Sequence, residues 1–486
     1  MRSIFKAAAV LGSASMLNIL IGLISSKITA VLLGPSGFGL AALYQSLLGL
    51  TVMCAGLGIP AAITRALARS LSRDPTGEAI ALRHAGWAVV IVAALISMAL
   101  IAGFSGSLTR NFFDSRTGAH WAIFIVPAVF FTMVSSVQIA IINAHHRVND
   151  LARINVLSAL FMLVPTVLII WQYRENGVAP SIAVGTAISF LVGNYFYRKL
   201  DQPEAINQLD GPSVRQAVVE LLRFGIPYMG SLIVGAGVLA LLPILVLHNL
   251  GDEEVGLFRA ASAIAVSYTG LLLAAMAQDY FPRVAKAPDD AASLNQVLND
   301  QLRFVMLLAG PIVIALIGLV PLILPLLYTT EFSGAAGLLR WQLLGDLFKF
   351  CAWAMGYIIM VKLGSVRFFL TELVCGAVLL ASCWTGMRLG GLPGLGMGFV
   401  ATGIFALFVN GLVLYRGARI VWRRDNQLLF LLLVSSTALV VGLSLEVGDI
   451  ATGIVSLTLS IVYGTYSILA IVREFGGWRM VLKRGR

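Results

Sequence analysis

The chain has 486 residues, of which 59% are hydrophobic and only 12% are charged, so it has too little polar surface for a soluble domain of this size. We therefore expect an all-α polytopic membrane protein. The net charge of +11 does not indicate a nucleic-acid partner, because no basic run is interleaved with aromatic residues. Membrane proteins also collect lysine and arginine in their cytoplasmic loops.

Apolar runs of membrane-spanning length occupy almost the whole chain, and we count fourteen. The first follows Arg2 and Lys6 and is too long for a signal-peptide core, so we interpret it as the first transmembrane helix. All the loops are short, and the longest, about 198–223, leaves no room for a soluble catalytic domain. The runs lie at approximately 8–33, 40–64, 85–104, 121–142, 151–171, 179–197, 224–248, 256–280, 304–327, 335–361, 368–387, 394–415, 428–445 and 450–472.

The distribution of basic residues predicts the orientation of these spans. With the N-terminus in the cytoplasm, the inside segments hold 26 of the 34 lysines and arginines, and the outside loops hold 4. Such an excess of cytoplasmic charge is typical of inner-membrane proteins, so both termini are predicted to be cytoplasmic. The remaining four basic residues, Lys27, Arg259, Arg340 and Lys349, lie inside spans.

An internal repeat predicts two similar lobes. The turn at 33–42 and the turn at 250–259 both place a Gly-Leu pair, Gly39-Leu40 or Gly256-Leu257, five residues after another glycine. Six spans separate the two copies, which indicates a parallel repeat of spans 1–6 and 7–12. The predicted parts are an N-lobe at 1–200, a cytoplasmic linker at 201–222, a C-lobe at 223–420, and two further helices with a basic tail at 421–486.

One span carries an unusual set of charges. Gln342, Asp346, Lys349 and Trp353 follow helical spacing and share one face, whereas Arg340 points roughly the opposite way. Charges inside a membrane require pairing or a polar cavity. Two interpretations are open: an internal Asp346–Lys349 pair with Arg340 reaching the outer interface, or a helix that lines a hydrophilic path. The rest of the chain favours the path.

The other basic residues within spans favour an anionic substrate. Lys27 lies about six residues, or roughly 9 Å, inside the outer end of the first span, and Arg259 and Arg340 lie near the outer ends of theirs. Each alone is more typical of a snorkelling side chain. Together with Lys349 they predict a cationic cavity that suits a phosphate.

No enzyme signature is present in the chain. It has no phosphate-binding Gly-x-x-x-x-Gly-Lys-Ser/Thr motif, and His145-His146 and the four cysteines have no metal-ligand spacing, so no metal or cofactor is expected. Asp279, in Asp279-Tyr280-Phe281-Pro282-Arg283, most simply ends the eighth span, and a role in ion coupling is the alternative.

Four stretches resemble those of a known family: 33–40, 256–261, 279–283 and 338–349. Over about residues 1–420 the chain resembles the polysaccharide flippases, the translocases of O-antigen and enterobacterial common antigen, of the multidrug/oligosaccharidyl-lipid/polysaccharide (MOP) exporter superfamily. The two additional C-terminal spans depart from the twelve-span members, although a fourteen-span arrangement also occurs in related flippases.

The resemblance implies a V-shaped, two-lobed bundle in the bacterial inner membrane. It implies a substrate as well, an undecaprenyl-diphosphate-linked oligosaccharide for O-antigen, exopolysaccharide or a related surface glycan, which moves to the periplasmic leaflet by alternating access. Glycan polymerase and chain-length regulator proteins are the implied partners. In related flippases, basic residues on spans 1, 2 and 8 meet the diphosphate; Lys27 and Arg259 match by span, and Arg65 matches less well because it lies at the cytoplasmic turn.

Three alternatives differ in what they require. A lipid II flippase for peptidoglycan needs the same cationic cavity. A cation-coupled drug exporter is expected to carry a carboxylate within spans 1–6, where the sequence has no Asp or Glu. A membrane enzyme, such as a glycan polymerase, needs a sizeable periplasmic loop or clustered catalytic groups, and the longest outside loop, about 105–120, offers neither.

Overall fold

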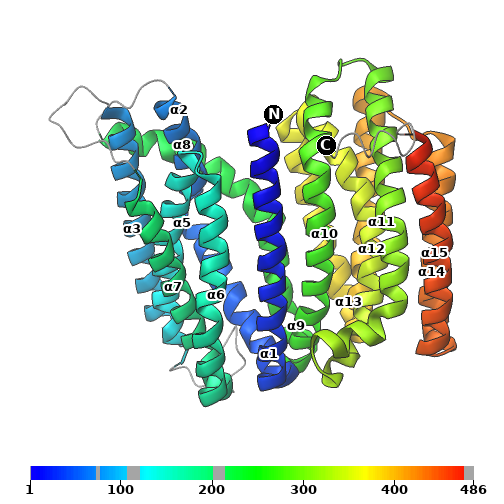
Figure 1. Ribbon diagram of the computed structural model, residues 1–486, viewed down its shortest axis with the longest axis horizontal. Helices are drawn as coiled ribbons and strands as arrows, with labels where there is room; N and C mark the ends of the chain where they lie inside the picture. Colours follow the sequence, from blue (N-terminus) through cyan, green and yellow to red (C-terminus); the bar gives the residue numbers. More distant parts are fainter. Residues whose placement is uncertain (1, 73–76, 105, 107–120, 201–213, 475–486) are drawn as a thin grey trace. The chain divides into compact units, whose positions relative to one another are not determined.

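The computed structural model describes residues 2–72, 77–104, 106, 121–200 and 214–474 (Figure 1). All regular structure in these ranges is helical, which confirms the predicted all-α class. The contacts divide the chain into two compact units, unit 1 at Met1–Gly256 and unit 2 at Leu257–Arg486, and each is described by itself.

Unit 1 is built from long helices that pack side by side. Its buried residues include Ile63 and Leu67, Leu82, and Met133 and Ile141, which come from α2, α3 and α5. Its elements are α1 (Arg2–Ala55), α2 (Ile59–Leu71), α3 (Gly77–Gly103), η1 (Trp121–Phe124), α5 (Ile125–Ala144), α6 (Val148–Tyr173), η2 (Arg174–Gly177), α7 (Val178–Arg198), α8 (Val214–Leu232), η3 (Ile233–Gly237), α9 (Val238–Asn249) and the start of α10 (Asp252–Lys286).

Unit 2 contains the rest of α10 and the helices that follow it. Val313 and Ile317 of α11 and Leu343 and Phe350 of α12 lie in its core. Its further elements are α11 (Ala291–Leu327), η4 (Thr330–Ala335), α12 (Ala336–Ile358), η5 (Ile359–Leu363), α13 (Ser365–Ala418), α14 (Arg424–Glu446) and α15 (Asp449–Glu474).

The predicted spans all fall on helical segments. Ten apolar stretches of the described residues are long enough to cross a membrane, and three of these, Leu17–Ala55, Val148–Arg198 and Ser365–Ala418, each include most or all of two predicted spans. The predicted eighth span lies on α10, which is not among the ten. Glycine separates two pairs of merged spans, because Gly34 (φ 66°) interrupts α1 and Gly391 (φ 59°) interrupts α13 in conformations that other residues rarely adopt.

The second predicted span, 40–64, is not one continuous helix. α1 ends at Ala55, and α2 begins at Ile59 after Leu57 (φ 49°) and Gly58 (φ 64°). A Cβ atom at Gly58 would lie 2.1 Å from the carbonyl oxygen of Gly225, so only glycine allows this approach of α2 to α8. The break therefore depends on a long-range contact that the hydropathy of the run does not reveal.

The division into units differs from the predicted lobe boundary at 201–222. α8 packs against α2 and α3, and α9 packs against α1, so the predicted seventh span lies in unit 1. The two helices that follow residue 420 are part of unit 2, since α14 and α15 both pack on α11. Gly318 of α11 lies against Ser456 of α15, whose hydroxyl donates to the carbonyl of Ile314.

The two predicted repeat glycines meet inside unit 1. A Cβ atom at Gly256 would lie 1.8 Å from the carbonyl oxygen of Pro35, and one at Gly39 would lie 2.7 Å from the nitrogen of Gly256. The hydroxyl of Ser36 donates to Asp252 at 3.0 Å across the same contact. The Gly-Leu pattern thus marks a close backbone approach between α1 and the start of α10.

Candidate functional site

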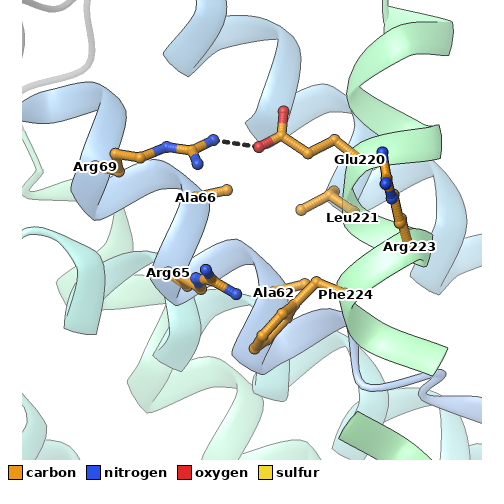
Figure 2. Close-up of a pocket in the computed structure, with 8 residues that line it drawn as sticks. All are labelled: Ala62, Arg65, Ala66, Arg69, Glu220, Leu221, Arg223 and Phe224. Carbon is orange, nitrogen blue, oxygen red and sulfur yellow. Dashed lines mark hydrogen bonds and ion pairs between the residues drawn. The ribbon is translucent and has the colours of Figure 1, made fainter. Parts of the chain in front are cut away.

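A basic pocket lies between α2 and α8 in unit 1 (Figure 2). Its volume is about 410 Å³. We call it the α2–α8 pocket, and its lining combines three arginines and one glutamate with apolar side chains: Ala62, Arg65, Ala66, Arg69, Glu220, Leu221, Arg223 and Phe224.

Helical spacing gathers these side chains from two short stretches of sequence. Arg65 and Arg69 are four residues apart on α2, and Glu220, Arg223 and Phe224 lie within four residues on α8, so each set shares one face of its helix. The backbone contact between Gly58 and Gly225 holds the two helices together beside the pocket.

The charges of the α2–α8 pocket are only partly balanced. Arg69 forms an ion pair with Glu220, in which both side chains remain partly exposed. Arg65 stacks over the ring of Phe224, with 4.5 Å between the guanidinium carbon and the ring centroid. Neither Arg65 nor Arg223 has a carboxylate partner among the described residues, so three arginines and one glutamate leave the pocket with a charge of +2.

In unit 2, the charged face of α12 is internally paired. The Nζ of Lys349 lies 3.8 Å from Oδ1 of Asp346 and 4.8 Å from the ring centroid of Trp353. The hydroxyl of Tyr268, on α10, donates to the other carboxylate oxygen of Asp346. This arrangement matches the first interpretation of the sequence, a pair that neutralises itself, although the Lys349 side chain stays 37% exposed.

Gln342 continues the same polar row. Its amide nitrogen donates to the hydroxyl of Ser262 at 3.2 Å, while its buried amide oxygen has no hydrogen-bond partner among the described residues. Polar contacts between α10 and α12 therefore include one from Gln342 and one from Asp346, and the hydroxyl of Tyr280 on α10 also donates to the carbonyl of Ala354 on α12 at 2.8 Å.

Arg340 is buried rather than free to reach water. Its Nη2 donates to Oδ1 of Asp449 at 2.7 Å, and its Nε donates to the carbonyl of Ile317 at 3.5 Å. The residue is 7% exposed, and its partner Asp449 begins α15. The pair ties α12 to α15 within unit 2, which gives Arg340 a role that needs no substrate.

The remaining predicted residues lie on separate helices. Lys27 is exposed on α1 in unit 1, and Arg259 is partly buried on α10 in unit 2, where it interacts electrostatically with Tyr328. The side chain of Asp279 lies outside the described residues, so its predicted coupling role stays a prediction. Among the predicted residues the structure brings together Asp346 and Lys349, and it gives Gln342 and Arg340 partners that were not predicted.

The sequence analysis missed Arg69, Glu220 and Arg223 as site residues and Asp449 as an ion-pair partner. A signal for the first three exists, because two arginines four residues apart and a Glu-x-x-Arg pair both place charge on one helix face. The sequence gives no indication that the two faces meet, since about 150 residues separate them.

The family match covers more than half of the chain. Residues 4–287 match the family described as polysaccharide biosynthesis protein. The lipid III flippases of Escherichia coli (strain K12) and Shigella flexneri are each 22% identical to this chain over 451 residues, covering 87% of the chain and 99% of each relative.

Solved structures of transporters share the fold. An inward closed conformation of the lipid II flippase MurJ superposes with a TM-score of 0.75 at 12% identity, covering 96% of this chain and 99% of MurJ. An inward-facing multidrug resistance MATE family transporter of the MOP superfamily gives a TM-score of 0.68 at 16% identity, covering 88% and 99%. The predicted resemblance to this superfamily is confirmed, and the relatives are named as flippases and transporters rather than enzymes.

Proposed function

Because the chain belongs to the polysaccharide biosynthesis protein family, we propose that it is a flippase for a lipid-linked oligosaccharide in the bacterial inner membrane. The substrate class is an undecaprenyl-diphosphate-linked glycan unit, such as an O-antigen or exopolysaccharide unit. The relatives support this class, since two are named lipid III flippases and a structural neighbour is named a lipid II flippase.

Lys27 is the observation that carries the proposal. It is an exposed lysine within the apolar stretch Leu17–Ala55, which is long enough to cross a membrane. A charge inside a membrane span costs several kcal/mol unless it meets a counter-charge or a polar space. A diphosphate is a counter-charge of this kind, and Lys27 would contact it as a point charge.

The proposed diphosphate-binding set is smaller than the sequence predicts. We retain Lys27 and Arg259, and also Lys349, because its side chain stays 37% exposed beside Asp346; Arg65 is treated with its pocket below. Arg340 is left out because Asp449 already neutralises it inside unit 2. Asp346 and Gln342 are assigned to the contacts between α10 and α12 instead of to the substrate.

The membrane potential favours the proposed direction of transport. With both termini in the cytoplasm and a negative cell interior, outward movement of an anion gains roughly 2.3 kcal/mol per charge per 100 mV. A diphosphate carries at least one negative charge through the membrane, so the potential alone can bias alternating access between the two leaflets. Glycan polymerase and chain-length regulator proteins would act on the product.

Depletion of the protein tests the proposal in cells. We expect the lipid-linked glycan to accumulate and the surface glycan to be lost, with wild-type protein restoring both. Lys27→Ala should fail to restore them at normal abundance, whereas Lys286→Ala, which removes an exposed lysine at the end of α10, should restore them. Unchanged surface glycan together with increased drug sensitivity would favour the multidrug exporter and contradict the proposal.

A peptidoglycan precursor is the second candidate substrate, since the fold match to the lipid II flippase covers 96% of this chain. Depletion separates the two substrates directly. Loss of a surface glycan in cells that keep growing indicates the first, whereas lysis with accumulated lipid II indicates the second.

A further inference from the structure

The α2–α8 pocket has the chemistry of a phosphate site, and we propose that it binds the phosphate group of a membrane lipid. The proposal rests on the proposed function only for the identity of that lipid, which would be the substrate as it enters from the cytoplasmic leaflet. The pocket residues that carry it are Arg65, Arg69, Glu220 and Arg223 (Figure 2).

The charges of the pocket indicate an anion. Arg65 and Arg223 have no carboxylate partner among the described residues, and both line the same cavity of about 410 Å³. A guanidinium presents a planar set of donors that binds phosphate oxygens in pairs, and arginine stays charged at every physiological pH. Stacking on Phe224 holds the Arg65 guanidinium in place without using its hydrogen-bond donors.

Among the described residues, Glu220 is the one carboxylate that lines the pocket, and it lies where a bound phosphate could replace it. Its carboxylate pairs with Arg69, so one of the three arginines is neutralised within the protein. Both side chains are more than 40% exposed, and an exposed pair contributes little to stability. An incoming phosphate can therefore displace Glu220 from Arg69 at low cost and gain a third guanidinium.

The helices around the pocket indicate a ligand at the membrane surface. Arg65 directly follows the predicted span 40–64, on the side where basic residues accumulate, so the predicted topology puts the pocket at the depth of cytoplasmic headgroups. α8 exposes Val219 and Ile226, which are 59% and 48% accessible, on the same helix face as Arg223. An arginine between exposed apolar side chains is typical of a membrane interface, so we expect lipid headgroups close to the pocket.

Close packing of α2 against α8 fixes the shape of the pocket. Gly58 and Gly225 place the backbones of α2 and α8 in direct contact, and Ala62, Ala66 and Leu221 form an apolar floor. The floor suits the glycerol or isoprenoid carbons next to a phosphate and offers nothing to a small inorganic ion. We therefore expect a phosphorylated lipid to bind more tightly than free pyrophosphate.

Direct binding to the full-length purified chain tests the proposal. Dioleoyl phosphatidic acid is titrated into the solubilised protein and bound lipid is counted by native mass spectrometry, with inorganic pyrophosphate in a parallel arm. The double variant Arg65→Gln/Arg223→Gln should bind the lipid at least about tenfold more weakly, because charge-assisted hydrogen bonds are lost. Arg198→Gln, an exposed arginine at the end of α7 outside the pocket, should bind as wild type does.

Glu220→Gln provides a gain of function that misfolding cannot imitate. It frees Arg69 and raises the pocket charge from +2 to +3, so the affinity for phosphatidic acid should increase severalfold. Unchanged affinity in the double variant, or weaker binding by Glu220→Gln, would overturn the proposal. Pyrophosphate binding as tight as that of the lipid would overturn the assignment to a lipid.

The experiments can reject lipid binding by the pocket and flippase function independently of each other. If the surface glycan requires the protein but the double variant binds lipid normally, the pocket proposal fails and the flippase stands. If lipid binding depends on the pocket while depletion leaves every lipid-linked glycan unchanged, the flippase fails and the pocket stands.

Discussion

Replacing Arg340 and replacing Asp449 should lower the free energy of unfolding by different amounts, although the two residues form one ion pair. The Arg340 side chain is 8% exposed, whereas that of Asp449 is 59% exposed. Arg340→Met removes the buried charge, and the released Asp449 regains water, so the loss is close to one hydrogen bond to a charged group, about 1.5 kcal/mol. Asp449→Ala leaves a buried guanidinium without its counter-charge and should cost about 3 kcal/mol.

A double-mutant cycle measures this asymmetry. Unfolding of the purified chain by SDS in mixed micelles gives the free energy of unfolding for the wild type, both single variants and the double variant. We expect Asp449→Ala to be nearly neutral once Arg340 is already Met, because the stranded charge has gone. Additive losses, or a neutral Asp449→Ala single variant, would refute the assignment of Arg340 to a structural pair.

The same variants separate this role from substrate binding. If Arg340 only ties α12 to α15, both single variants should lower protein abundance and leave surface glycan per molecule unchanged. Loss of glycan in Arg340→Met at normal abundance, with Asp449→Ala active, would restore Arg340 to the substrate as the sequence predicts.

Two further predictions concern glycine packing and pH. Gly256→Ala should lower the free energy of unfolding by about 2 kcal/mol, because its Cβ atom would lie 1.8 Å from the carbonyl oxygen of Pro35. Gly22→Ala is the matched control, because no neighbouring atom lies within 4 Å of the Cβ atom that it would add. Equal effects of the two substitutions in SDS unfolding would contradict the packing argument. Asp290 caps α11 by accepting a hydrogen bond from the Ser293 amide at 2.8 Å, and this bond lowers the pKa of the Asp290 carboxyl. A lowered folded-state pKa contributes stability above the ordinary aspartate pKa that is lost as the pH falls through the folded-state value. Asp290→Ala should therefore lower the melting temperature at pH 7 and have progressively less effect in acid, and a pH-independent difference would contradict the cap.

The sequence was sufficient for the fold class because apolar runs of this length indicate membrane-spanning helices. The predicted spans fall on helical segments, and the turns at Gly34 and Gly391 lie between predicted spans. The break at Gly58 was not predicted, because it depends on Gly225 in another helix. The sequence predicts that the helices after residue 420 lie outside the repeat. In the structure they belong to unit 2, and the Ser456 hydroxyl of α15 donates a hydrogen bond to α11.

Charged residues were easier to locate in the sequence than to interpret. Asp346 and Lys349 are three residues apart, so their pairing could be weighed from helical spacing alone. Arg340 and Asp449 are 109 residues apart, and no local pattern connects them. The α2–α8 pocket was missed for the same reason, since Arg65 was noted as a single residue and its partners lie on a helix near residue 220.

Translocation in vesicles tests the central claim most directly. The purified full-length chain is reconstituted into liposomes that contain an undecaprenyl-diphosphate-linked oligosaccharide, and a membrane-impermeant probe counts the glycan in the outer leaflet over time. The account predicts faster exchange between leaflets than in protein-free vesicles, slowed by Lys27→Ala and unaffected by Lys286→Ala. Exchange no faster than in protein-free vesicles, with the protein shown to be folded and inserted, would contradict it.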